Sequence, residues 1–94
     1  MTNIFVNKVE SEEYLVTVSA ELETKHNVKV SQTTYLNYTK GKISQERLLE
    51  FCFDFLLQRE SNTSILNSFK LEIIEVYFPE FKEELKKWLD SNVK

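Results

Sequence analysis

The chain has 94 residues, which is the size of one small domain with a single hydrophobic core. Its one cysteine, Cys52, cannot form an internal disulfide, and with the one histidine, His26, it cannot complete a four-ligand zinc site. The formal net charge of −3 is spread evenly along the chain, which argues against a surface built to bind phosphate. We therefore expect a single domain over residues 1–94, with disorder confined to its ends and a core rich in aromatic rings, which make up 13% of the sequence.

The N-terminal segment MTNIFVNKVESEE has neither the basic start nor the apolar run of a signal peptide. No stretch of the chain approaches the roughly 18 apolar residues of a membrane-spanning helix. A lone cysteine also fits a reducing compartment. These features predict a cytoplasmic protein that does not act in a membrane and that needs no cofactor or metal.

Alternating side chains predict β-strands near the N-terminus. Residues 14–19 place Tyr and Val on one face, and residues 26–30 repeat this period. The polar segment 20–25 can connect the two runs, and residues 4–6 extend the pairing. We expect an antiparallel hairpin of two or three strands.

Residues 31–40 fit either a strand or a helix. Threonine and tyrosine favour a strand, whereas Ser31 as N-cap and Gly41 just past the end favour a short helix, which is the preferred interpretation. The next segment is clearer, because Ser44 can cap a helix that runs from Gln45 to Arg59. Apolar side chains cover most of that helix, so other elements should surround it.

The last third of the chain should be helical. One or two short helices are expected between the polar run 61–64 and Pro79, and an amphipathic helix over residues 79–90. The predicted fold class is α+β, with an N-terminal antiparallel hairpin packed on three to four α-helices and the Gln45 to Arg59 helix in the centre.

Several residues could carry chemistry, and each has a simpler structural explanation. Cys52 lies in mid-helix among apolar neighbours that raise a thiol pKa, so core packing explains it best. His26 is expected at a surface or strand edge. The carboxylates of Glu46, Glu50 and Asp54 form a solvated stripe, because bundle metal sites also need histidines from facing helices. Lys40-Gly41-Lys42 is a weak phosphate-loop candidate and fits a helix stop.

Two kinds of binding surface remain open. A β-ribbon carrying Lys25 and Lys29, with Arg47 nearby, could meet nucleic acid, although the acidic balance argues against it. Six aromatic side chains could exceed what a small core can cover and form an interface, or they could simply be core: Tyr35, Tyr38, Tyr77, Phe78, Phe81 and Trp88.

The stretch from Thr24 to Leu85 resembles a group of small bacterial proteins of about this length. The resemblance is carried by the segments TKHNVKV with Tyr35-Leu36, FLLQRE, SIL with Phe69, and YFPEF. It implies a family that is a whole domain, and it brings no activity, ligand or catalytic residue. Arg59 and Glu60, which end the long helix, are our candidates for a structural ion pair or a contact surface.

The sequence therefore predicts a protein-interaction or regulatory module rather than an enzyme, with homodimerisation as one form of that interaction. Its surface should use the sheet edge or an aromatic patch around Tyr77, Phe81 and Trp88. The alternative is an antitoxin-like or transcription-associated module whose β-ribbon binds nucleic acid. The sequence shows no nucleophile and base at recognisable spacing and no cofactor loop, so it does not predict a catalytic function.

Overall fold

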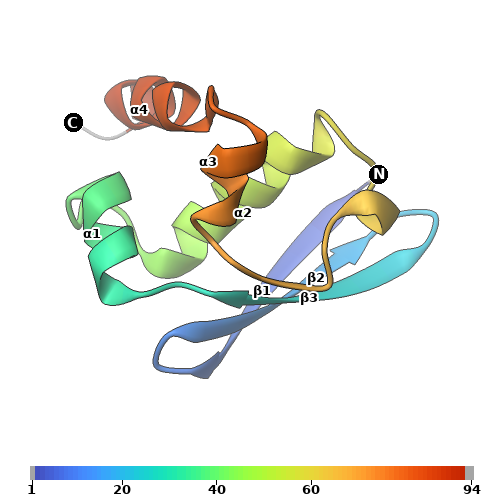
Figure 1. The fold of residues 1–94 in the computed structure, drawn as a ribbon. Coiled ribbons are helices and arrows are strands. Elements are labelled where there is room, and N and C mark those ends of the chain that lie inside the picture. The colour runs from blue at the N-terminus through green and yellow to red at the C-terminus, as the bar shows by residue number, and fades with distance from the viewer. Residues whose placement is uncertain (1, 93–94) are drawn as a thin grey trace.

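The fold is an α+β arrangement in which three strands of a four-stranded sheet come first and the fourth lies between helices, as a computed structural model of residues 2–92 shows (Figure 1). The elements in chain order are β1 (Asn3–Glu10), β2 (Glu13–Ser19), β3 (Glu23–Lys29), α1 (Gln32–Thr39), α2 (Gln45–Leu57), the 3-10 helix η1 (Asn62–Ser64), β4 (Ser68–Lys70), α3 (Ile73–Tyr77) and α4 (Phe81–Asn92). The predicted fold class is confirmed, and the expected disorder at the extreme ends falls on residues outside the described part.

The sheet is mixed, which corrects the prediction of a hairpin alone. Its strand order is β1-β2-β3-β4, with antiparallel pairing up to β3 and a parallel pairing of β3 with β4. The short β4 strand lies in a segment predicted to be helical. Because three residues pair with a strand some forty positions earlier, no local pattern could signal it.

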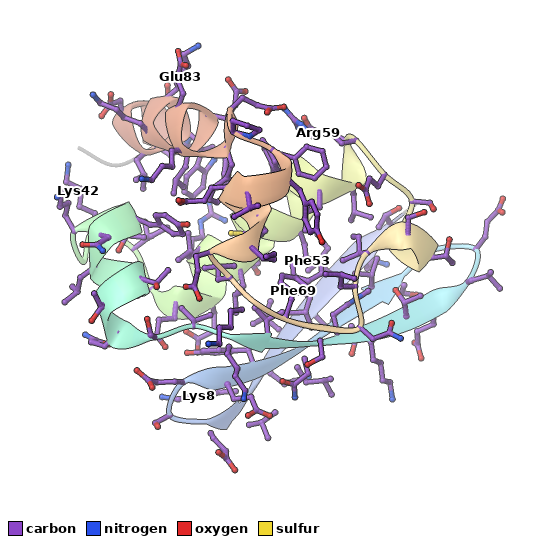
Figure 2. All side chains as sticks on the ribbon, in the orientation of Figure 1. Lys8, Lys42, Phe53, Arg59, Phe69 and Glu83 are labelled. Atoms are coloured by element: carbon purple, nitrogen blue, oxygen red, sulfur yellow. The ribbon has the colours of Figure 1, made fainter. Side chains whose placement is uncertain are left out.

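The helices all cover one face of the sheet and leave the other face to solvent (Figure 1). Tyr14, Val16 and Val18 of β2 are buried on the covered face, as their alternation predicted. Between the sheet and α2, Phe53 and Phe69 face each other with ring centroids 6.2 Å apart (Figure 2). The main core therefore lies between the sheet and α2.

The central position predicted for α2 is confirmed, although the helix ends at Leu57 rather than Arg59. The Ser44 hydroxyl accepts a hydrogen bond from the Arg47 amide, which caps the N-terminus. One side of α2 packs on the sheet, and another side contacts α4 through the Phe55 and Phe81 rings, 5.2 Å apart. An apolar surface on several sides of one helix is thus explained by two layers of neighbours.

The ambiguous segment 31–40 is a helix, α1. The Ser31 hydroxyl accepts a hydrogen bond from the Thr34 amide at its start. At its end Lys40 adopts a left-handed conformation (φ 56°) and its amide donates to the Leu36 carbonyl. Gly41 follows with φ 74°, a conformation that glycine adopts without steric cost. The capping residues therefore outweighed the β propensity of the threonines and tyrosines, and the segment forms a helix.

The terminal helix begins and ends two residues later than predicted. Pro79 lies in the turn between α3 and α4, where the Phe81 amide donates to the Phe78 carbonyl. The apolar face predicted from Phe81, Leu85 and Leu89 is buried as expected. Within residues 2–92, no helix combines the length and the apolar character that crossing a lipid bilayer requires.

Candidate functional site

The aromatic residues predicted to form an interface occupy different environments. Tyr77 on α3 is exposed, with 62% of its surface accessible. Phe81 is completely buried and packs against the rings of Tyr38, Phe51 and Phe55, so assigning it to a surface is wrong. The i, i+4 pattern of the terminal helix could not distinguish a core from a docking face, because both bury the same stripe.

Trp88 belongs mainly to the contact between α2 and α4. Its ring lies 4.8 Å from the Phe51 ring, and the Arg47 guanidinium lies 5.3 Å from its centroid. The side chain is half-buried, so only part of it faces solvent. Trp88 and Tyr77 therefore do not form one patch with Phe81.

Arg59 forms an ion pair, but its partner is Glu80 rather than its neighbour Glu60. Arg59 Nε lies 3.2 Å from Glu80 Oε2, a second guanidinium nitrogen donates to the Phe55 carbonyl, and the group stacks 3.7 Å from the Phe55 ring centroid. The Glu80 backbone amide and the Arg59 side chain hold the pKa of the Glu80 carboxyl below its usual range. Arg59 thus joins the end of α2 to the start of α4.

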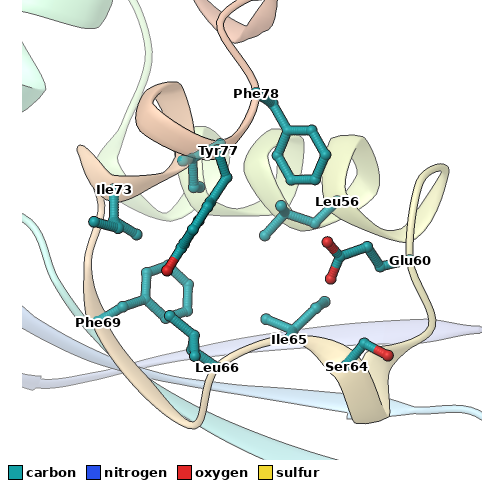
Figure 3. A pocket seen from close by; sticks show the side chains of 10 residues that line it. Leu56, Glu60, Ser64, Ile65, Leu66, Phe69, Ile73, Tyr77 and Phe78 are labelled. Atoms are coloured by element: carbon teal, nitrogen blue, oxygen red, sulfur yellow. The ribbon is translucent and has the colours of Figure 1, made fainter.

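Glu60 instead faces an open apolar groove between the end of α2, the η1–β4 connection and α3 (Figure 3). The volume of this groove is about 400 Å³, within the usual range for binding pockets. Its lining comes from segments far apart in the chain: Leu56, Glu60, Ser64, Ile65, Leu66, Phe69, Ile73, Ile74, Tyr77 and Phe78. We call this the α2–α3 groove.

Leu66 and Tyr77 form the exposed rim of the α2–α3 groove. Leu66 is 47% exposed and Tyr77 62% exposed, so both present apolar surface to solvent beside the groove. The Glu60 carboxylate points into the open space from the α2 side (Figure 3). The other lining residues with a polar side-chain group are Ser64 and Tyr77, and the rest of the lining is apolar.

Helix α3, which carries Tyr77, is held in place by hydroxyl groups of α1. The Thr34 hydroxyl donates to Glu72 at 2.7 Å, and the Tyr38 hydroxyl donates to Glu75, which Lys82 also approaches at 3.9 Å. Burial and the bond to Glu75 raise the pKa of Tyr38. Hydrogen bonds to a carboxylate are stronger than those between neutral groups, so these bonds hold the α3 wall of the groove firmly in place.

His26 fixes the opposite wall, and the expectation that it lies at a surface or edge is wrong. It is completely buried beside Phe53. Its Nδ1 donates to the Leu66 carbonyl at 2.7 Å, and its Nε2 accepts from the Thr24 hydroxyl at 2.9 Å. Asn62 Nδ2 donates to the same Thr24 oxygen. This chain of hydrogen bonds ties the η1–β4 connection to β3.

The sequence offered no signal for this role of His26 other than its place in the alternating pattern. His26 shares the buried face with Val28, so the period itself indicated burial. Its polar character suggested exposure instead, because the partners that satisfy it come from residue 24 and from residue 66. A polar side chain is buried without a large cost only when such partners exist.

Cys52 is buried in the core, where burial raises the pKa of its thiol. A protonated, inaccessible thiol is a poor nucleophile. Among residues 2–92, no group of three or more His, Cys, Asp or Glu side chains is placed to hold a metal ion. Within the carboxylate stripe of α2, Glu50 pairs with Arg47 at 3.6 Å.

The basic residues considered for nucleic acid do not gather as predicted. Lys25 and Lys29 project from β3 on the uncovered sheet face, where β4 adds Lys70 directly beside Lys29. Arg47 lies on α2, on the other side of the sheet, against Trp88. The Lys40-Gly41-Lys42 segment forms the end of α1 and the following turn, as the simpler explanation predicted.

Comparisons with known proteins found no match for this chain: no protein-family model fits it, and no curated protein or solved structure is significantly similar to it.

Proposed function

We propose that the protein is an interaction module that binds an apolar segment of a protein partner in the α2–α3 groove. The observation that carries this proposal is an open groove of about 400 Å³ with Leu66 and Tyr77 exposed on its rim. Exposed apolar side chains around a concave surface are typical of binding sites, and tyrosine is enriched where binding energy is concentrated.

The partner segment combines a large apolar side chain with a lysine or arginine. The apolar side chain fills the space between Leu56, Ile65 and Phe69, and the cation reaches Glu60. Glu60 takes part in none of the ion pairs formed within residues 2–92. A carboxylate at an apolar rim favours a partner cation, because the pair is partly shielded from water.

The shape of the site supports binding without rearrangement. Hydrogen bonds from α1 hold the α3 wall, and His26 holds the Leu66 wall. A preformed groove avoids the entropy cost of ordering a loop during association. The charged side chain among the lining residues is that of Glu60, which suits recognition of a cation, and the proposal includes no catalytic step.

The test is selection of random twelve-residue peptides displayed on phage against the immobilised protein. The enriched peptides should carry a Leu, Phe or Trp near a Lys or Arg. Leu66→Asp should weaken their binding by at least about tenfold, equal to about 1.4 kcal/mol. Glu60→Lys should change the selected charge from basic to acidic. Val9→Asp is the matched control, because Val9 is 54% exposed on β1, the edge strand opposite β4.

Peptides that bind the wild type and the Leu66→Asp variant equally well would contradict the proposal. Glu60→Lys separates the two parts of the argument. If this variant keeps the preference for basic peptides while Leu66→Asp removes binding, the groove is the site and Glu60 is not its charge contact.

A second candidate function is nucleic-acid binding on the uncovered sheet face, favoured by the grouping of Lys25, Lys29 and Lys70 there. Exposed Phe5 on the same face offers a ring on which a base could stack. Retention of a single-stranded oligonucleotide at low salt, lost steeply as salt rises, would support it. The variant Lys29→Glu should then abolish retention.

A further inference from the structure

The outer edge of β1 is unpaired along its length. β1 is the first strand of the sheet order, and its ladder partner is β2 alone. Outside that ladder, none of the hydrogen bonds formed within residues 2–92 reaches the backbone of residues 3–8. Exposed strand edges are templates for pairing with another strand, and natural edges usually carry charges or proline to prevent it.

The ladder pattern shows which groups of β1 point outward. The Val30 amide donates to the Glu12 carbonyl at 2.8 Å, so even-numbered residues of β2 direct their backbone groups to β3. Odd-numbered residues of β2 therefore bond to β1, where Thr17 is paired with Phe5. The backbone groups of Phe5 point inward, and those of its neighbours Ile4 and Val6 point to the free edge.

The exposed stretch of this edge reads almost identically in both directions. Residues 3–7 are Asn-Ile-Phe-Val-Asn, with Phe5 at the centre and no charged side chain. An antiparallel partner with the same sequence can therefore match it residue by residue about a two-fold axis at Phe5. Phe5 is 53% exposed and, because it pairs with Thr17 between the buried Val16 and Val18, it lies on the sheet face that the helices leave uncovered.

We propose that the protein forms a homodimer in which the β1 strands of two copies pair antiparallel through Phe5. Ile4 of each copy then exchanges backbone hydrogen bonds with Val6 of the other. Asn3 lies opposite Asn7, where the two side-chain amides can bond to each other, and the two Phe5 rings face each other across the axis. The dimer has one continuous eight-stranded sheet, and both copies of α2 lie on the same face.

Other registers that keep the outward groups paired are less favourable. Moving the axis to Val6 places Ile4 opposite Lys8 and Phe5 opposite Asn7. That arrangement loses the aromatic pair and sets an apolar side chain against a charge. The palindromic pattern therefore selects the register as well as the partner, which is why a second copy fits this edge better than an unrelated strand.

The first test is cross-linking with engineered cysteines. Opposite residues of a non-hydrogen-bonded pair have Cα atoms about 4.5 Å apart, within the range of a disulfide. Phe5→Cys should therefore form a disulfide-linked dimer on mild oxidation, and native Cys52 is buried and should not interfere. Thr17→Cys, the neighbour of Phe5 on β2, is the control and should stay monomeric on a denaturing gel.

The second test is the mass in solution across a range of protein concentrations. Wild type should approach twice the monomer mass, and Phe5→Lys should remain a folded monomer, because two added charges meet at the axis while the core is untouched. Leu66→Asp should leave the dimer intact, which separates this proposal from the groove. A wild type that is monomeric at every concentration, or equal cross-linking through Thr17→Cys, would overturn it.

Discussion

The burial of Phe81 gives the sharpest test of the packing. Its ring is inaccessible and lies within about 6 Å of three others, with centroid distances of 5.5 Å to Tyr38, 6.1 Å to Phe51 and 5.2 Å to Phe55. Replacing a buried Phe by Ala removes the transfer free energy of the ring and leaves a cavity, which costs about 3 to 5 kcal/mol. The unfolding free energy of a domain of this size is about 5 to 14 kcal/mol, so Phe81→Ala should lose a substantial part of that stability and unfold at lower urea.

The assay is urea unfolding followed by far-UV circular dichroism and by the fluorescence of Trp88, whose ring contacts Phe51. With a slope of about 1.5 kcal/mol per molar urea, the expected loss lowers the midpoint by about 2 to 3 M. Tyr77→Ala is the control and should cost less than about 1 kcal/mol, because the side chain is mostly exposed. A loss below about 1 kcal/mol for Phe81→Ala, or an equal loss for both variants, would refute the arrangement of α4 on α2.

Three further outcomes follow from the buried polar groups. Cys52 should not react with a thiol reagent in the folded protein, because it is buried and its thiol pKa is raised, and it should react fully in urea. Fast reaction without denaturant would contradict this prediction. His26→Phe keeps a ring beside Phe53 but leaves the Leu66 carbonyl without its hydrogen-bond donor. Urea unfolding should therefore show a free energy of unfolding lower by about 1 to 3 kcal/mol. An unchanged midpoint would argue against the chain of hydrogen bonds through His26. The raised pKa of Tyr38 means that the fold favours the neutral phenol. The stability that this preference contributes is therefore fully present below pH 10.0, the ordinary pKa, and declines as the pH rises above it. In melting temperatures measured across a pH series, Tyr38→Phe should lose less stability at alkaline pH than the wild type.

Local patterns predicted the elements whose stabilising interactions are themselves local. The alternation in residues 14–19 predicted which face of β2 is buried, because successive side chains of a strand point to opposite faces. Ser31 and Ser44 predicted the starts of α1 and α2, because each hydroxyl accepts a hydrogen bond from an amide three residues later. The apolar side chains around most of the circumference of α2 predicted its central position in the fold.

The candidate site was predicted only in pieces. Tyr77 and Glu60 were selected from the sequence, and both line the α2–α3 groove. They were selected together with Phe81 and Trp88, which belong to the packing of α4 on α2 instead. Leu66 and Phe69 were not considered as lining, because their positions depend on β4, a strand that only its pairing with β3 defines.

By itself, the sequence determined that this chain combines strands and helices in an α+β fold, where helix α2 begins, and that Cys52 is a core residue. Those properties follow from side-chain periodicity and capping, whose partners lie within a few residues. Only the tertiary structure decided that His26 is buried, that Arg59 pairs with Glu80, that residues 68–70 extend the sheet, and that a groove lies between α2 and α3. Each of these depends on atoms brought together from distant positions, and no local pattern records which distant partner will satisfy a polar group or cover an apolar one.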